Sequence, residues 1–205
     1  MLEPDHLRRA LIDEMFQWGP ALAGDVRARY PATLVRELAT LGILARRKFR
    51  GFEVYVLSGK GLRPYGLALR YNYVPARSTV MGSLILRAQA RVWRAAGYGV
   101  EPYEEYTKKG RGNLALARRD DELVALVGRP SLTIRALRMI AEHLSEQTPT
   151  IQRLQVYIVP GDHDPVLISA QTVSGLPVTI TELPLSSVTR YIPDEVTNDL
   201  QTATA

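Results

Sequence analysis

The stretch "LVRELATLGILARRKFRGFEVYVLSGKG", residues 34–61, changes its hydrophobic period half-way along. Before Gly42 the apolar residues recur at helical spacing, and after it apolar and polar residues alternate as they do in strands. We therefore predict a helix capped at its C-terminus by Gly42, followed by two strands, 43–48 and 52–57, with a tight turn at residues 50 and 51. Four cations lie close to that turn: Arg46, Arg47, Lys48 and Arg50.

Two more helices are expected before this stretch. Residues 5–18 show helical spacing of apolar side chains, with Asp5 as a candidate N-cap and a Gly-Pro pair at 19 and 20 as a stop signal. A shorter helix fits residues 21–29, and Pro31 suits the first turn of the third helix. The predicted order is three helices followed by a basic hairpin.

The positive charge of the chain is concentrated in its N-terminal part. Residues 1–77 hold 13 Lys or Arg against 7 acids, which gives +6. Residues 78–129 hold 9 against 6, which gives +3, and residues 130–205 hold 4 against 8, which gives −4. A polyanionic partner is therefore expected at the N-terminal part.

The three helices and the basic hairpin resemble the winged helix-turn-helix domain of many prokaryotic DNA-binding regulators. In that family the recognition helix ends in a Leu-Gly-Ile or Leu-Gly-Leu turn, and the second strand closes in Tyr-x-Leu-Ser/Thr-x-x-Gly, as at residues 41–43 and 55–61. The resemblance implies that the third helix enters the major groove and that the hairpin, or wing, lies along the phosphate backbone. The outer face of the recognition helix is then Thr33, Arg36, Glu37 and Thr40, the residues near the backbone are Arg27 and Arg29, and the phosphate-binding wing residues are Arg46, Arg47, Lys48 and Arg50.

The remainder of the chain predicts a second, mixed α/β unit. We expect a winged helix over 1–62, a connecting or crossing segment over 63–77, a small α/β domain over 78–185 and a tail over 186–205 that includes a short docking helix or reaches a second copy. The fold class is α+β, with a mixed sheet in the second domain.

The elements expected in this second unit alternate between helices and strands. A helix over 78–95 carries Arg87, Arg91 and Arg94 on one side, and Ser131 is expected to cap a later helix. The predicted elements are helix 78–95, strands 98–106, 113–119 and 122–128, helix 132–146, and strands 153–160 and 176–184.

This order of elements resembles the restriction-endonuclease-like core of PD-(D/E)xK nucleases, and its pairing with a winged helix resembles the replication-relaxation proteins of plasmids and mobile elements. Active nucleases of that family hold a divalent metal with an Asp, a Glu and a Lys. The matching positions are Asn113, Val127 and Arg129, which do not form such a site. The resemblance therefore implies a non-catalytic domain, used for scaffolding, dimerisation or a second nucleic-acid surface at Lys108, Lys109, Arg111, Arg118 and Arg119.

Other acidic clusters leave a catalytic alternative open. A displaced carboxylate site could use Glu101, Glu104, Glu105, Asp120, Asp121 and Glu122, although such acids are more often turn residues or partners of nearby cations. The sequence "GDHD" at 161–164 follows an expected strand, but Gly-Asp and Asp-Pro pairs are also ordinary turn chemistry. We predict no metal and no cofactor.

Composition excludes several classes of protein. The chain has no cysteine, which rules out disulfides, cysteine-ligated zinc and a thiol nucleophile. It has no apolar run of membrane-spanning length and no signal-peptide core, so a cytoplasmic location without membrane contact is expected. The sequence favours a non-enzymatic protein that binds double-stranded DNA as a transcriptional regulator or a replication or plasmid accessory factor, with a homodimer as one arrangement. The alternatives are a metal-dependent nuclease and a protein-assembly module.

Overall fold

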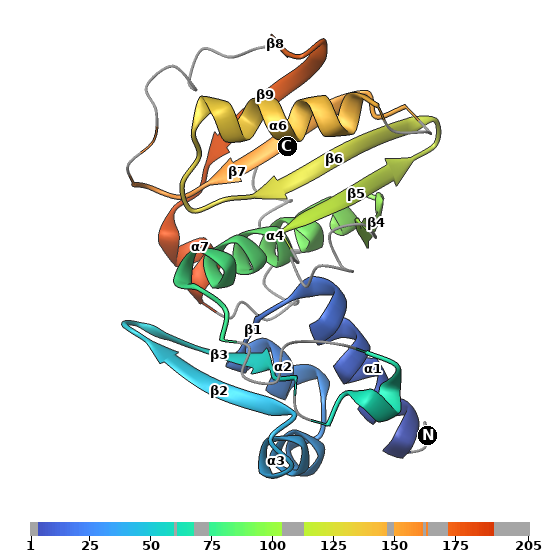
Figure 1. Ribbon diagram of the computed structural model, residues 1–205, viewed down its shortest axis with the longest axis vertical. Helices are drawn as coiled ribbons and strands as arrows, with labels where there is room; N and C mark the ends of the chain where they lie inside the picture. Colours follow the sequence, from blue (N-terminus) through green and yellow to red (C-terminus); the bar gives the residue numbers. More distant parts are fainter. Residues whose placement is uncertain are drawn as a thin grey trace, which may run out of the picture.

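The computed structural model describes residues 4–59, 61–67, 74–103, 113–146, 150–161, 163 and 172–190. The fold is α+β, with a three-stranded sheet near the N-terminus and a six-stranded mixed sheet after it. In Figure 1 the helix α4 (Arg77–Ala95) lies between the two sheets. The α+β class and the mixed sheet expected from the sequence are confirmed.

The N-terminal part contains three helices and a small antiparallel sheet in the order β1-β3-β2. Residues 21 and 22, expected to begin the second helix, instead form a short strand, because they pair with Tyr55 and Val54 of the hairpin. Pro31 precedes the third helix in an extended conformation and is not part of its first turn. The elements are α1 (Pro4–Trp18), β1 (Ala21–Leu22), α2 (Ala23–Arg29), α3 (Ala32–Thr40), β2 (Leu44–Phe49) and β3 (Phe52–Leu57).

The predicted end of α3 at Gly42 is confirmed in detail. Gly42 has φ +70°, and its N–H donates to the Ala39 carbonyl at 3.0 Å. The next N–H, that of Ile43, donates to the Leu38 carbonyl at 2.9 Å. These two bonds make a Schellman motif, which satisfies the last carbonyls of the helix and directs the chain into β2.

The described part of the segment that connects the hairpin to α4 packs on the N-terminal core. It contains the 3₁₀ turn η1 (Arg63–Tyr65), and Leu62 beside it is buried. Tyr65 and Leu67 contact the same core. Tyr71 and Tyr73 lie outside the described residues.

The second sheet has the strand order β4-β5-β6-β7-β9-β8. Strands β6, β7 and β9 are parallel, and the other pairs are antiparallel. The strands expected over 122–128 and 153–160 are present, the second ending at Ile158, and the short strand β8 was not predicted. The elements are β4 (Gly99–Pro102), β5 (Leu114–Arg119), β6 (Glu122–Gly128), α6 (Ile134–Ser145), β7 (Arg153–Ile158), β8 (Thr172–Val173), β9 (Leu176–Glu182) and α7 (Leu185–Thr189).

Two boundaries in this second part differ from the prediction. The strand expected over 98–106 is described only as Gly99–Pro102, and residues 104–112 lie outside the described chain. Ser131 does not cap the following helix, because Thr133 does so: its hydroxyl accepts from the Ala136 N–H at 3.2 Å. Both Ser and Thr are good caps, and the helix begins two residues later than expected.

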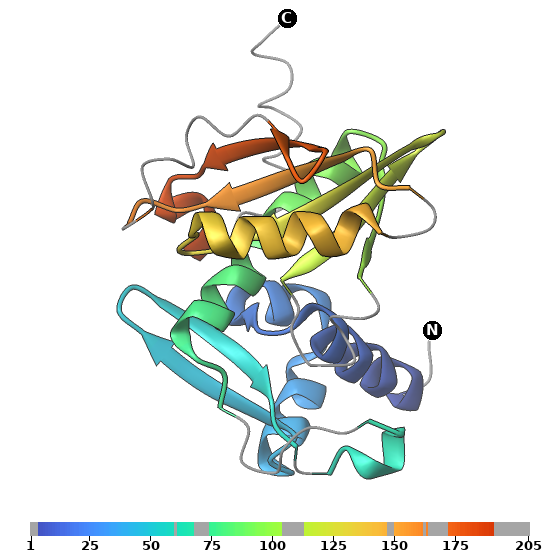
Figure 2. The same ribbon diagram turned by 45° about the horizontal axis from the view of Figure 1, so that its top comes forward.

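Helices cover both faces of the large sheet (Figure 2). On one face, α6 packs over side chains such as Leu123, Ala125 and Val127 of β6. On the other, α4 packs over Val124 and Leu126, which alternate with them along the strand. The core under α4 continues into the N-terminal part, where the residues that join it are Trp18, Leu22, Val54 and Val56. The two sheets therefore share one hydrophobic core through α4.

The helix α4 approaches the end of β6 closely at a pair of glycines. A Cβ atom added at Gly82 would lie 2.8 Å from the carbonyl oxygen of Gly128, which is closer than real Cβ contacts come. A Cβ at Gly128 would meet the backbone of α4 at Gly82 and Leu86. Both obstacles are backbone atoms, so a side chain at either position forces the helix away from the sheet.

We predict that Gly82→Ala destabilises the protein by about 1–3 kcal/mol through overpacking. A loss of stability is informative here, because replacing glycine by alanine inside a helix otherwise stabilises a protein by about 0.5–1 kcal/mol. Urea unfolding of the variant, compared with Ser78→Ala on an exposed turn of the same helix, measures the difference. A Gly82→Ala protein as stable as the wild type would contradict the close approach.

Candidate nucleic-acid interface and an arginine-rich pocket

The outer face of α3 matches the sequence prediction. Leu34, Val35 and Leu38 are buried, and the residues predicted for the outer face are all exposed: Thr33, Arg36, Glu37 and Thr40. Glu37 is held by Arg8 of α1 at 2.6 Å. Among the described residues, Arg36 has no hydrogen-bond or ion-pair partner for its guanidinium group, which leaves all of its N–H donors open to solvent.

The β2–β3 hairpin has two different faces. Alternate side chains, among them Phe49 and Phe52, pack toward the core under α4, and their rings stack at 5.1 Å between centroids. The turn itself projects at one side of the molecule, next to the end of α4 (Figures 1 and 2). The hairpin is therefore anchored along one face, while its four cations are exposed: Arg46, Arg47, Lys48 and Arg50.

One acid within the hairpin was missed by the sequence reasoning. Glu53 lies opposite Lys48 in the strand register and forms an ion pair with it at 3.5 Å. Arg46 also donates to Glu53, through Nε at 2.9 Å and through a second N–H. The hydrogen bond from Arg46 lowers the pKa of the Glu53 carboxyl. Arg47 and Arg50 have no such partner in the described chain, so the free charge of the hairpin is concentrated on these two residues.

The two arginines predicted near the DNA backbone have different surroundings. Arg27 is exposed, and its Nε donates to the Ala23 carbonyl at 3.1 Å. Arg29 instead holds Glu14 of α1 with two N–H groups, at 2.7 and 2.8 Å. Its guanidinium is therefore committed to an intramolecular pair.

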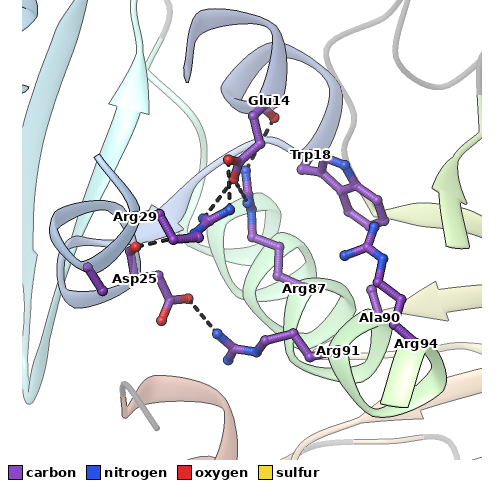
Figure 3. Close-up of a pocket in the computed structure, with 9 residues that line it drawn as sticks. Glu14, Trp18, Asp25, Arg29, Arg87, Ala90, Arg91 and Arg94 are labelled. Carbon is purple, nitrogen blue, oxygen red and sulfur yellow. Dashed lines mark hydrogen bonds and ion pairs between the residues drawn. The ribbon is translucent and has the colours of Figure 1, made fainter. Parts of the chain in front are cut away.

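A charged pocket of about 490 Å³ lies between α1, α2 and α4 (Figure 3). Four arginines and two acids contribute to its wall, together with one indole ring. The lining residues are Glu14, Trp18, Asp25, Ala28, Arg29, Arg87, Ala90, Arg91 and Arg94.

The inner end of the pocket is built around Glu14. Arg87 reaches from α4 and donates to the Glu14 carboxylate at 2.6 Å and to the Gly19 carbonyl at 2.9 Å. The Arg87 side chain is only 9% exposed. Arg29 and the Tyr30 hydroxyl, at 2.8 Å, also donate to the same carboxylate. One negative charge thus accepts from two guanidinium groups and a phenol.

The outer part of the pocket carries two further arginines of α4. Arg91 pairs with the buried Asp25 at 3.1 Å, and the other oxygen of Asp25 has no hydrogen-bond partner among the described residues. Arg94 lies 5.0 Å from the centroid of the Trp18 ring and donates to the Val100 carbonyl at 2.8 Å. The sequence predicted that these arginines share one side of the helix, and that is confirmed. It did not indicate that this side faces α1 and α2.

Burial and charge act in opposite directions on Glu14. Burial alone would raise the pKa of its carboxyl, but the charge of Arg87 and the hydrogen bonds from Arg29 outweigh it and hold the pKa below its ordinary value of 4.5. Burial raises the pKa of the Tyr30 hydroxyl, and its bond to Glu14 adds to this effect. Glu14 is therefore ionised at neutral pH, and Tyr30 keeps its proton.

The three positions that match the metal-binding residues of PD-(D/E)xK nucleases are held in contacts of the fold itself. Val127 is buried in the core under α6, and the Asn113 carbonyl accepts from the Gly128 N–H. Arg129 lies directly after β6, and its backbone N–H donates to the Tyr157 carbonyl. In the part of the chain that the structure describes, no three His, Asp or Glu side chains group as a metal site.

Several residues of the alternative sites fall outside the described chain or are held by other contacts. Glu122 accepts from the Tyr98 hydroxyl at 2.5 Å and from Arg153 at 3.0 Å. His163 contacts the Val159 carbonyl at 2.7 Å. Four residues of these alternative sites lie outside the described ranges: Glu104, Glu105, Asp162 and Asp164.

The structure describes only two of the five residues predicted to form a second nucleic-acid surface. Arg118 and Arg119 at the end of β5 are exposed, and Arg119 lies over the Tyr98 ring at 4.3 Å. Arg119 also donates to the Ala96 carbonyl at 3.2 Å. The other three residues of that predicted surface, Lys108, Lys109 and Arg111, lie outside the described chain.

No protein-family model, curated protein or solved structure matches this chain. Across the described residues, no helix combines the length and the apolar character needed to cross a membrane.

We predict that Glu14→Gln destabilises the protein by about 3 kcal/mol or more, because it leaves the buried Arg87 charge without a counter-ion. Glu53→Gln is the matched control: it also breaks an arginine pair, but a solvent-exposed one, so the expected loss of stability is much smaller. Urea unfolding at pH 7 measures both. Equal effects of the two substitutions would show that the Glu14 pair is not a buried structural link.

Because the pKa of Glu14 is lowered in the folded protein, the stability of the protein depends on pH. The contribution of Glu14 to the free energy of unfolding is fully present above pH 4.5 and is lost as the pH falls through the lower pKa of the folded state. The free energy of unfolding of the wild type should therefore fall more steeply below pH 4.5 than that of Glu14→Gln. Parallel curves for the two proteins would contradict this assignment.

Proposed function

We propose that this protein binds duplex DNA in the manner of a winged helix, with α3 in the major groove and the β2–β3 hairpin on the phosphate backbone. Its work is then that of a regulator or accessory factor on DNA. The observation that carries the proposal is the arrangement of free cations: Arg36 on the outer face of α3, and Arg47 and Arg50 on the hairpin, are exposed and without acidic partners among the described residues.

The local geometry supports this proposal. A helix and a hairpin are joined by the tight turn at Gly42, so that the exposed face of α3 and the cations of β2 are separated by few residues. A third strand, β1, completes the small sheet and fixes the hairpin against the helices. Winged helices place a recognition helix and a wing next to each other in this way.

The attachment of the hairpin to α4 is compatible with DNA binding. Phe49 and Phe52 anchor one face, but Arg47 and Arg50 remain exposed beside them. A hairpin held at a fixed angle loses less conformational freedom when it meets the backbone than a free one would. Glu53 reduces the charge that Arg46 and Lys48 present, so these two residues are expected to contribute less than Arg47 and Arg50.

We predict that Arg47→Gln combined with Arg50→Gln weakens binding to duplexes of any sequence. The slope of log affinity against log salt should fall by roughly 0.9 for each phosphate that the variant no longer neutralises. The control is Arg135→Gln combined with Arg138→Gln, which removes two exposed charges from α6. Fluorescence anisotropy at several salt concentrations is the measurement. Equal losses of affinity in the two double variants would point to a general effect of net charge.

We predict that Arg36→Ala changes which sequences are preferred, because a guanidinium on the outer face of a recognition helix contacts base edges. The expected loss is about 1–3 kcal/mol at a preferred site and much less on random duplexes. Selection of bound fragments from a random pool, followed by titration of the recovered site, measures it. A uniform loss on all sequences would place Arg36 on the backbone.

A further inference from the structure

The two faces of the β2–β3 hairpin carry different cations. Leu44 at the start of β2 packs in the core that α1, α2 and α3 form. Arg46 and Lys48 follow Leu44 at every second position of the strand, so their side chains lie on the same face of the hairpin. Arg47, between them, lies on the opposite face with Phe49, which packs toward α4. The side of the hairpin that carries α3 therefore presents Arg46 and Lys48.

These two cations already hold an anion, the carboxylate of Glu53 on β3. Arg46 donates to one carboxylate oxygen through Nε at 2.9 Å and through a second N–H. The Lys48 ammonium lies 3.5 Å from the other oxygen. Charge-assisted contacts of this kind are the strong ones among hydrogen bonds. We call this arrangement of Arg46, Lys48 and Glu53 the Glu53 clamp.

The cations of the Glu53 clamp can be reached by an anion from solvent. The side chains of Arg46 and Lys48 are 50% and 74% exposed. The hairpin extends past the three helices toward its turn, as Figure 1 shows. A backbone phosphate offers the same kind of paired anionic oxygens as a carboxylate, and arginine binds both in the same geometry. A rotation of the Glu53 side chain is enough to free both cations, because the carboxylate is held only through its oxygens.

An ionised Glu53 opposes such a phosphate in two ways. It takes up the N–H groups that the phosphate needs, and its own charge repels the phosphate. The hydrogen bond from Arg46 lowers the pKa of the Glu53 carboxyl, so the charge is present at neutral pH. At an exposed position water and salt weaken both effects, so Glu53 reduces binding without abolishing it.

We propose that Glu53 is an intramolecular competitor of the DNA backbone, which holds Arg46 and Lys48 on the α3 side of the hairpin until a phosphate displaces it. This inference rests on the proposed DNA binding and adds a limit on its strength. Phosphates are the same in every sequence, so Glu53 lowers the affinity for all duplexes alike. The preference among sequences, which we assign to base contacts of Arg36, does not depend on Glu53.

The test compares Glu53→Gln with the wild type by fluorescence anisotropy on a random-sequence duplex at several salt concentrations. Glutamine keeps the shape of the side chain and removes its charge. We expect the affinity to rise by roughly three- to tenfold at low salt. The slope of log affinity against log salt should steepen by roughly 0.9 for each phosphate that Arg46 or Lys48 then binds. Equal affinities and equal slopes in the two proteins would overturn the inference.

Two further comparisons separate the Glu53 clamp from a general effect of charge. Glu142→Gln removes one exposed acid from α6 and changes the net charge by the same amount, so it should raise the affinity much less. Arg46→Gln should cost more affinity in the Glu53→Gln background than in the wild type, because only there is the guanidinium open to phosphate. Equal gains from the two glutamate substitutions, or equal costs of Arg46→Gln in the two backgrounds, would overturn the competitor role.

The same measurements distinguish this inference from the proposed function. If the wild type binds duplexes and Glu53→Gln binds them no better, only the competitor role fails. If neither protein binds any duplex, the proposed DNA binding fails and the competitor role fails with it. If Glu53→Gln binds and the wild type does not, the competitor role holds and the wild-type hairpin is blocked under those conditions. Thermal unfolding of Glu53→Gln shows that it is folded, as expected for a solvent-exposed pair.

Discussion

The contact between Arg87 and Glu14 is the constraint on which the arrangement of the two sheets depends. Arg87 is almost fully buried, and a guanidinium keeps its charge at any ordinary pH. Burying that charge without partners would cost several kcal/mol, so α4 must sit where Glu14 and the Gly19 carbonyl can accept its N–H groups. The apolar contacts between the same elements are less selective, because hydrophobic attraction has no direction.

This contact has a consequence for the hairpin. Once α4 is fixed against α1, its apolar face lies beside Val54 and Val56 of β3 and beside the two phenylalanines near the turn. One side of the hairpin is then covered, and the charged residues are left at its outer side and its turn. The same helix covers the large sheet through its other side, so a single element with buried residues over most of its length sets the positions of both sheets.

The sequence predicts elements well where the signal is local. The change of period at Gly42, the turn at residues 50 and 51 and the nearly continuous apolar run of β6 each depend on neighbouring residues, and all three agree with the structure. The strand at residues 21 and 22 was missed, because it forms by pairing with β3 more than thirty residues later, which no local pattern indicates. The helix cap at Thr133 was misplaced because two good capping residues stand close together.

The contacts at the candidate sites also differ in whether local sequence could reveal them. Glu53 could have been found from sequence, since the predicted turn places it directly opposite Lys48. The partner of Arg87 could not, because Glu14 lies 73 residues earlier and no spacing rule connects them. The three arginines of α4 share a helical face, which the period reveals, but a helical face carries no sign of whether it meets solvent, DNA or another helix.

Net charge along the chain is therefore an imperfect guide to where a polyanion binds. The N-terminal part has a formal excess of positive charge, yet Arg8, Arg9, Arg29, Arg46 and Lys48 all have carboxylate partners within it. A cation that already holds a carboxylate must give up that partner, or share it, before it can bind phosphate, which reduces the gain. Arg36, Arg47 and Arg50 have no carboxylate partner among the described residues and do not have this cost. If the protein binds DNA as we propose, the electrostatic attraction comes from a smaller surface than composition implies, formed by the outer face of α3 and the turn end of the hairpin.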